Sequence, residues 1–336
     1  MRKRWYPPVR AGLNATRIIL PLLGSDDAGT EAIDSGSESN SPATIAAYLL
    51  ARFSQSRDDI NKKIARGDIY ASTGEPISRS TPYQPGEWVF LYRDPPADEP
   101  TVLALNDIEI LYQDEQLLVI DKPHQVSVIP RGRWVTQTAL VHLRNTLNLP
   151  NLSPLHRLDR PTAGILVFSL NPAERGKYQM LFQNRQVSKE YLAVASKPKD
   201  LTQFPLEVSS RIVKERGIPR AQEISGEPNA FTYIEVAATK ATKATHATSD
   251  TALYRLKPNT GKTHQLRLHM NSLGLPIVGD PFWPVLHPDL LADQTPEIPL
   301  QLLAHRLEFT DPLTGERRIF ESRRGLAAWS ANLAPY

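Results

Sequence analysis

The amino-acid sequence predicts an α+β protein organised in two domains. Segments typical of strands and of helices follow one another without the strict alternation that builds a parallel α/β sheet. A stretch at 93–100 contains three prolines and separates a short helical part from a longer, strand-rich part. With 336 residues the chain has room for two domains, which we expect at 1–100 and 101–336.

The first domain is predicted to be a small α/β unit. An acidic segment at 25–42, rich in Ser and Gly, lacks the apolar side chains that would offset the entropy of ordering it, so we expect a flexible loop. Apolar residues at helical spacing predict a helix at 43–53 and a second helix at 56–67, ending at the glycine. Two short strands are expected to follow, at 69–71 and 86–92.

The second domain begins with elements that we expect to share one core. Two strands are predicted within 108–123, on either side of a Gln-Asp-Glu turn. A helix is predicted near 137–147 and a buried strand at 164–169. Asn171 is expected to cap a further helix that starts at Pro172, because proline is favoured at the first helical position.

The following segments continue this mixed order. Alternating residues predict a strand at 187–196. Strand-like segments at 231–236 and 252–256 flank a polar stretch at 238–249, which we interpret as a hairpin loop. The mixture of hairpins and helices favours the α+β class.

Composition narrows the class of protein. There are 39 Lys and Arg residues against 36 Asp and Glu, which gives a net charge of +3 and a pI of about 9.0. This balance excludes a histone-like polycation but allows a polyanionic partner where basic residues cluster. The chain has no cysteine, which excludes disulfides, thiol nucleophiles and cysteine-ligated metal centres. Apolar runs are strand-sized and no export signal is evident, so we expect a cytoplasmic protein without a membrane span.

The densest group of chemically active side chains lies at 154–169. Asp159 stands among His156, Arg157 and Arg160, just before the buried strand. Nearby positive charge favours an ionised aspartate, which suits a nucleophile or a general base at neutral pH. The same residue types also fit a turn aspartate in a local salt bridge, so the residues alone leave both roles open.

Tyr191 lies on the predicted strand at 187–196, on the same face as Ala193 and Ala195. These small neighbours leave room for its ring to stack on a planar ligand. A tyrosine buried in the core and satisfied by one hydrogen bond fits the pattern as well.

Arg267 lies near the start of a helix that we expect Thr263 to cap and Gly274 to end. The helix dipole disfavours a cation at this end, so Arg267 is expected to have a carboxylate partner, and Asp159 is the candidate. The alternative is a solvated arginine. The buried stripe of this helix is predicted to be Leu266, Met270 and Leu273.

Two other patterns in this region come close to ligand-binding motifs but do not match them. Gly261, Lys262 and Thr263 suggest a phosphate loop, but the glycine that such a loop requires is replaced by Leu256, so a nucleotide triphosphate site is excluded. His264 and His269 are five residues apart, which is not the spacing of a helical metal pair, and we expect no metal.

Together these segments resemble the RluA-type family of RNA pseudouridine synthases. HRLDRPTAG at 156–164 is similar to the family's H-R-L-D-x-x-T-S-G motif, and KEYLA at 189–193 to its following strand. TGKTHQLRLHMNSLGLPIVGD at 260–280 is similar to its T-G-R-T-H-Q-I-R-x-H block. Two departures, Ala163 for serine and Lys262 for arginine, affect local hydrogen bonds. The resemblance covers 108–320 and includes the Asp-Lys-Pro end of the strand at 121–123.

The resemblance implies a fold, a reaction and a set of site residues. The fold would be a pseudouridine synthase fold, with a central mixed, largely antiparallel sheet and flanking helices. Asp159 would be the catalyst, Arg267 its partner, and Tyr191 would stack on uracil and is the best-placed candidate to take the proton from carbon 5. The reaction is an isomerisation that needs no cofactor and no metal. RNA would be bound by His156, Arg157, Arg160, Thr162, Lys189, Lys262 and His264.

The N-terminal part is similar to the small RNA-binding domain of a ribosomal small-subunit protein that is fused to many of these synthases. SRDDINKKIARGDIYASTGEPI at 56–77 matches its pattern in degenerate form. A cationic helix edge against phosphate would then consist of Arg57, Lys62, Lys63 and Arg66, although a solvated charged face fits these residues too.

The predicted partner is structured RNA, with ribosomal RNA favoured over transfer RNA, and we expect a monomer. An alternative is a non-catalytic RNA-binding or ribosome-assembly protein of the same fold. The presence of Asp159, Tyr191 and Arg267 together argues against that alternative.

Overall fold

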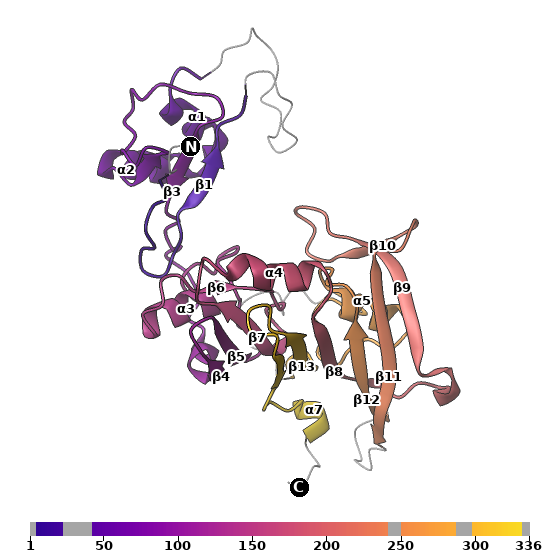
Figure 1. Cartoon of the computed structure of the whole chain (residues 1–336). Coiled ribbons are helices and arrows are strands. Elements are labelled where there is room, and N and C mark those ends of the chain that lie inside the picture. The colour runs from indigo at the N-terminus through magenta and orange to yellow at the C-terminus, as the bar shows by residue number, and fades with distance from the viewer. Residues whose placement is uncertain (1–4, 23–41, 241–249, 287–297, 331–336) are drawn as a thin grey trace. The chain divides into compact units, whose positions relative to one another are not determined.

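The computed structural model describes residues 5–22, 42–240, 250–286 and 298–330. The chain divides into two compact units, Met1–Pro96 and Ala97–Tyr336, called here the N-terminal and the C-terminal unit (Figure 1). The division lies inside the proline-rich stretch at 93–100. The flexible loop expected at 25–42 lies, apart from its last residue, outside the described residues.

The N-terminal unit packs two helices on one face of a three-stranded antiparallel sheet. Its elements are β1 (Thr16–Ile19), α1 (Ile45–Arg52), the 3₁₀ turn η1 (Ser54–Ser56), α2 (Arg57–Arg66), β2 (Ile69–Ala71) and β3 (Trp88–Leu91), with the sheet order β1-β3-β2. Ile18, Ile69 and Val89 pack from the sheet against Leu49 and Ile64 of the helices. The two predicted helices and the two predicted strands are confirmed. β1 lies outside the predicted strands because it pairs with the sequence-distant β3, which local patterning does not reveal.

The C-terminal unit is built on one mixed sheet, 11-stranded within the described residues. Its strand order is β10-β9-β11-β12-β8-β13-β7-β5-β4, with β14 beside β13 and β6 beside β7 (Figure 1). The strands are β4 (Glu109–Gln113), β5 (Leu117–Lys122), β6 (Ser153–Pro154), β7 (Ala163–Ser169), β8 (Ser188–Ser196), β9 (Leu206–Val213), β10 (Gln222–Ile224), β11 (Ala230–Lys240), β12 (Thr251–Pro258), β13 (Leu302–Thr310) and β14 (Arg317–Glu321). The pairing is antiparallel except between β13 and β7.

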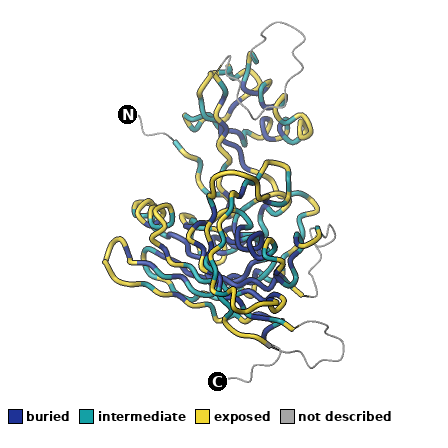
Figure 2. The backbone as a smooth tube through the Cα atoms, turned by 90° about the vertical axis from the view of Figure 1, so that its right-hand side faces the viewer, coloured by how far each residue is buried: buried dark blue, intermediate teal, exposed yellow. Residues whose placement is uncertain are grey.

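Helices cover both faces of this sheet. They are α3 (Ala139–Thr146), α4 (Arg175–Gln183), α5 (Gln265–Ser272) and α7 (Ala327–Ser330), with 3₁₀ turns η2 (Leu103–Asp107) and η3 (Leu201–Gln203). α3 packs on one face of β5 and β7, while Tyr178 of α4 packs on the other face. α5 packs through Leu266 and Met270 on β8, β11 and β12. The buried residues, dark blue in Figure 2, lie mainly in the interior of each unit. Within the described residues, no helix combines the length and apolarity needed to cross a bilayer.

Most predicted elements of this unit are confirmed, with three corrections at their ends. α4 begins at Arg175 and not at Pro172, because Asn171 caps a preceding turn by accepting the N–H of Ala173. β11 runs to Lys240, so the loop expected at 238–249 starts later, and its remaining residues lie outside the described ones. α5 begins after His264, and Thr263 is not its cap.

The turn before α5 is instead held by Gln265. Its side-chain oxygen accepts the hydroxyl of Thr260 at 2.7 Å and the N–H of Lys262 at 3.1 Å, which ties the turn to the first residue of the helix. The predicted stripe of Leu266, Met270 and Leu273 does face the core.

The close approach of β7 and β13 determines where the site lies. Tyr191 of β8 lies opposite Ala304 of β13, and Ala304 lies opposite Gly164 of β7. A Cβ atom at Gly164, which has φ +110°, would stand 2.2 Å from the carbonyl oxygen of Ala304. Only glycine therefore lets β7 reach β13 and bring the turn that precedes it beside Tyr191.

Candidate active site

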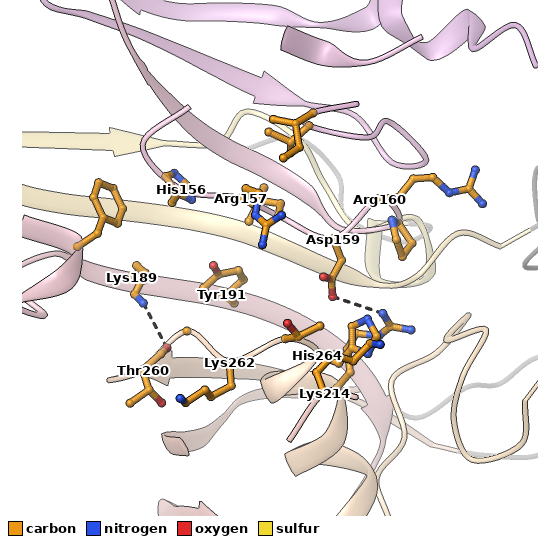
Figure 3. A pocket seen from close by; sticks show the side chains of 18 of the residues that line it. His156, Arg157, Asp159, Arg160, Lys189, Tyr191, Lys214, Thr260, Lys262 and His264 are labelled. Carbon is orange, nitrogen blue, oxygen red and sulfur yellow. Dashed lines mark hydrogen bonds and ion pairs between the residues drawn. The ribbon is translucent and has the colours of Figure 1, made fainter. Parts of the chain in front are cut away.

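Asp159 is held at the start of a tight turn that leads into β7. The N–H of Thr162 donates to the carbonyl of Asp159 at 3.0 Å, and the carbonyl of Pro161 accepts a hydrogen bond from Nδ1 of His124 at 2.6 Å. The side chain of Asp159 is 30% exposed and lies within the cavity of Figure 3. The turn thus presents one carboxylate at the edge of the sheet.

Lys122, the last residue of β5, fastens this turn. Its fully buried ammonium donates to the carbonyl oxygens of Pro123, Val126 and Arg160 at 2.9, 3.0 and 3.2 Å. Burial lowers the pKa of Lys122 to about 7, while the charge of Asp159 acts in the opposite direction. Lys122 therefore ties the end of β5 to the backbone next to Asp159.

Arg267 has two carboxylate partners. Its Nε and Nη2 donate to the two oxygens of Asp280 at 2.8 and 2.6 Å, and Nη1 donates to Asp159 at 3.4 Å. Burial acts to lower the pKa of Arg267, but the hydrogen bonds and charge of Asp280 outweigh it, and the pKa is raised. The expected contact between Arg267 and Asp159 is present, but its distance of 3.4 Å is longer than the distances to Asp280.

Aromatic rings enclose the same guanidinium. The guanidinium carbon of Arg267 lies 4.6 Å from the ring centre of Phe282 and 5.2 Å from that of Trp283. His264 packs on both rings, and its Nδ1 accepts the N–H of Ala221 at 3.2 Å. Burial lowers the pKa of His264 to about 4, so it is neutral at pH 7. The cation is thereby fixed in position by a shell that excludes water.

Tyr191 and Lys189 project from β8 into the other side of the cavity (Figure 3). Burial raises the pKa of Tyr191, and the charge of Asp159 adds to this effect, so the hydroxyl keeps its proton at neutral pH. Lys189 donates to the carbonyl of Thr260 at 3.3 Å, and burial lowers its pKa. The prediction that Tyr191 shares a strand face with Ala193 and Ala195 is confirmed.

These side chains line a cavity of about 1050 Å³. Among the described residues, Asp159 is the one carboxylate on its wall, whereas eight side chains are cationic. They are Arg131, Arg157, Arg160, Arg185, Lys189, Lys214, Lys262 and Arg267. The described residues include no group of three His, Asp or Glu side chains arranged as a metal site. The cavity is therefore built for an anionic ligand that meets one carboxylate.

The structure brings most of the predicted site residues to this cavity. Its wall includes His156, Arg157, Asp159, Arg160, Lys189, Tyr191, Lys262, His264 and Arg267, and Thr162 lines an adjoining pocket. Two of them are less available to a ligand. Thr162 is 3% exposed. His156 stacks on Phe182, and its Nε2 accepts the N–H of Val167, while burial lowers its pKa to about 3.

The cationic edge predicted on α2 is smaller than expected. Lys63 is 2% exposed, and its ammonium contacts Asp94 at 2.5 Å, so it is not part of an exposed edge. Arg66 is exposed but lies near Asp68 and Asp94, at 3.3 and 3.6 Å. Arg57 and Lys62 are the two members of the set that are exposed and form no ion pair with a carboxylate of the described residues.

Several residues of the site had no role in the sequence analysis, among them the cavity cations Arg131, Arg185 and Lys214. Lys122 and Asp280 belong to the matched motifs, but their partners are backbone carbonyls and a buried arginine that sequence patterns do not identify. Trp134 also lines the cavity. The two charged residues that follow the buried run at 117–120, Asp121 and Lys122, are the signal in the sequence, because a charge at the end of a buried strand requires partners.

Comparison with known proteins places the chain in a family. The sequence model described as RNA pseudouridylate synthase matches residues 116–272. The tRNA pseudouridine synthase C of Pasteurella multocida is 34% identical over 221 residues, which are 62% of this chain and 88% of that protein. The dual-specificity RNA pseudouridine synthase RluA of Escherichia coli is 30% identical over 223 residues, 63% of this chain and 91% of that protein.

A solved structure supports the same fold. Human RNA pseudouridylate synthase domain containing 1 is 24% identical and superposes with a TM-score of 0.50, over 67% of this chain and 86% of that chain. The resemblance seen in the sequence motifs is thus confirmed by relatives that match over most of their length. The chain belongs to the RluA-type family of RNA pseudouridine synthases, enzymes that isomerise uridine in RNA.

Proposed function

We propose that this enzyme converts specific uridines of structured RNA to pseudouridine with Asp159 as the catalytic carboxylate. The observation that carries the proposal is the cavity wall, where Asp159 is the one carboxylate among eight cationic side chains within the described residues. Such a surface attracts the RNA polyanion, and it brings the sugar and base of one nucleotide to the carboxylate of Asp159.

The chemistry requires a positioned carboxylate and no imported group. The bond between uracil N1 and ribose C1′ breaks, the base turns, and a bond forms between C5 and C1′. The proton on C5 leaves and N1 gains a proton, so atoms balance. Attack on the sugar, addition to C6 and removal of a sugar proton are three roles open to Asp159, and each is served by a carboxylate held in place.

Arg267 and Tyr191 support this carboxylate in different ways. Nη1 of Arg267, at 3.4 Å, directs positive charge at Asp159 and limits its rotation. The ring of Tyr191 is assigned to stack on the uracil, and its hydroxyl to the C5 proton. Because burial raises the pKa of Tyr191, the hydroxyl needs another base or a change in local charge before it accepts a proton.

Access to Asp159 requires that the target uridine leave its stack. The carboxylate lies in a cavity, so a paired or stacked base reaches it only by flipping, at a cost of a few kcal/mol. Arg157, which is exposed and lines the cavity, is assigned to occupy the space that the base leaves.

Ribosomal RNA is the proposed target. This rests on the N-terminal unit, for which we propose an RNA-binding role through Arg57 and Lys62, both exposed on α2. The family model matches residues 116–272, so this unit lies outside the matched region. The relatives include one enzyme named for tRNA and one named as dual-specificity, and the experiment therefore covers both RNAs.

The test is a map of pseudouridine in total ribosomal and transfer RNA from cells that lack this gene. The cells are complemented with the intact protein or with Asp159→Asn. We expect one or a few ribosomal sites to vanish and only the intact protein to restore them. Restoration by Asp159→Asn would overturn the assignment of the catalyst, and loss of transfer RNA sites alone would overturn the ribosomal target. Purified protein that binds RNA without forming pseudouridine would favour a non-catalytic role.

A further inference from the structure

Trp134 and Arg160 form a stacked pair on the cavity wall next to Asp159. The guanidinium carbon of Arg160 lies 4.4 Å from the ring centre of Trp134, and both side chains line the cavity. Arg160 follows Asp159 directly in the chain, and in Figure 3 its side chain extends away from Tyr191 and Lys189. Arg160 therefore extends on the side of Asp159 away from Tyr191, the residue assigned to stack on uracil, and Trp134 lies in contact with Arg160.

The loop that carries Trp134 is rigidly held. One oxygen of Glu99 accepts the backbone N–H groups of Val135, Thr136 and Gln137, and the other accepts the hydroxyl of Thr136 at 2.7 Å. Burial of this carboxyl acts to raise its pKa, but these hydrogen bonds outweigh burial and the pKa of Glu99 is lowered. The loop is thus anchored by a carboxylate that stays ionised.

Neighbouring contacts orient the tryptophan toward the cavity. Arg131 and Trp134 exchange backbone hydrogen bonds at 2.9 and 3.2 Å, which makes the tip a tight turn. Val135, the next residue, is fully buried, whereas Trp134 is half-buried. The backbone of Arg160 is held by Lys122 at 3.2 Å. Both members of the pair are therefore fixed through their backbones before any ligand arrives.

We propose that the Trp134–Arg160 pair is a stacking platform for the nucleobase adjacent to the target uridine. This rests on the proposed function, since the neighbour is defined by the flipped uridine. An indole face and a guanidinium plane both stack on bases, and the guanidinium adds attraction for phosphate. When the uridine leaves its stack, its neighbour loses a stacking partner, and the platform holds that neighbouring base beside the space assigned to Arg157. The pair would then favour substrates whose neighbouring base stacks strongly.

The test is the binding of full-length protein to RNA hairpins with a seven-nucleotide loop. The loop carries one central uridine flanked by adenosines, and each flanking base is removed in turn to leave an abasic position. Affinity is measured by fluorescence anisotropy for the wild type, Trp134→Ala and Trp134→Phe. We expect Trp134→Ala to bind the intact loop roughly 5- to 100-fold more weakly. Trp134→Phe, which keeps a flat ring, should lose much less.

The decisive result is the dependence on the neighbouring base. With the base removed on the side that contacts Trp134, wild type and Trp134→Ala should bind equally. A matched control is Tyr233→Ala, which removes the ring of another cation–π pair, formed with Lys257 at 5.7 Å, outside the cavity wall. This control should bind like the wild type, and melting curves of all variants check that they are folded.

Three results would overturn the platform. They are equal binding of the intact loop by wild type and Trp134→Ala, a deficit that survives both abasic substitutions, and failure of the wild type to bind any hairpin. Pseudouridine yield on the same hairpins is measured separately. Binding that depends on Trp134 without conversion would count against the proposed reaction on these RNAs and leave the platform standing.

Discussion

Asp280 binds the guanidinium of Arg267 through both carboxylate oxygens, at 2.8 Å from Nε and 2.6 Å from Nη2. Both side chains are almost fully buried, with 1% of Arg267 and none of Asp280 exposed. This pair fixes the plane of the guanidinium, so that Nη1 is the group left to face Asp159. Asp280 is therefore a positioning residue, which acts on the proposed catalyst through Arg267.

Removing Asp280 should cost stability as well as activity. Asp280→Ala leaves a buried arginine without its main partner, and we expect a loss of about 3–5 kcal/mol in the free energy of unfolding. Denaturant titration measures this. The control is Glu321→Ala, which breaks the exposed pair with Arg306 and should cost less than about 1 kcal/mol. Equal losses in the two variants would contradict the assigned role of Asp280.

Asp159→Asn should separate binding from catalysis. The amide keeps the size of the side chain but supplies no carboxylate, so pseudouridine formation should fall below detection in single-turnover assays. RNA affinity should stay within about tenfold of the wild type, because the cavity keeps its eight cationic side chains. A loss of affinity as large as the loss of turnover would show that Asp159 serves binding instead.

Tyr191→Phe should keep the ring and remove the hydroxyl. We expect RNA binding to be retained and turnover to slow by about 10²- to 10⁴-fold if the hydroxyl transfers the C5 proton. Loss of that proton would then limit the rate, so uridine deuterated at C5 should react more slowly in the variant than unlabelled uridine. Unchanged turnover, or slowing without an isotope effect, would remove Tyr191 from this step.

Lys122 should make stability depend on pH. Its pKa is lowered to about 7 in the folded protein by burial, against about 10.4 in an unfolded chain. Between these values the unfolded state binds more protons than the folded state, so this group makes the free energy of unfolding rise with pH. The stability of the wild type relative to Lys122→Met should therefore increase from pH 7 to pH 9.5. Lys197→Met, at a partly exposed lysine, should show no such trend.

Gly164 and Gly176 should respond to alanine in opposite directions. A Cβ atom at Gly164 would meet the backbone of Ala304 at 2.2 Å, at a φ of +110°, so Gly164→Ala should destabilise by about 3–5 kcal/mol or prevent folding. Gly176 lies in α4 with no atom within 4 Å of such a Cβ. Gly176→Ala should stabilise by up to about 1 kcal/mol. Thermal melts of both variants measure these changes. A loss of stability below about 1 kcal/mol for Gly164→Ala would contradict the close approach of β7 and β13.

Local patterns in the sequence were sufficient to predict most elements and the meeting of Asp159 with Arg267. These residues lie in contiguous motifs next to buried strands and a helix, where periodicity is informative. The residue type of Thr263 predicts a cap, but α5 starts after His264 and has no side-chain cap. Residue type alone does not fix at which residue a helix begins.

Long-range partners account for the remaining differences. The resemblance to an RNA-binding domain predicts Lys63 on an exposed cationic edge, whereas the side chain of Lys63 is buried and pairs with Asp94, which is distant in sequence. Lys122 and Asp280 owe their positions to groups that only the folded chain brings near them. The chemical roles of Asp159, Tyr191 and Arg267 stay predictions, and the variants above address those of Asp159 and Tyr191.

The charge of the cavity has a consequence for the protein without RNA. Eight cations around one carboxylate, within the described residues, attract small anions from the solvent as a counterion layer. Entry of an RNA strand displaces these ions, so that the entropy of their release contributes to binding. Phosphate and sulfate, which carry more charge than chloride, compete for the same positions. The anions of the buffer therefore take part in the binding equilibrium, and RNA affinity depends on their identity and concentration.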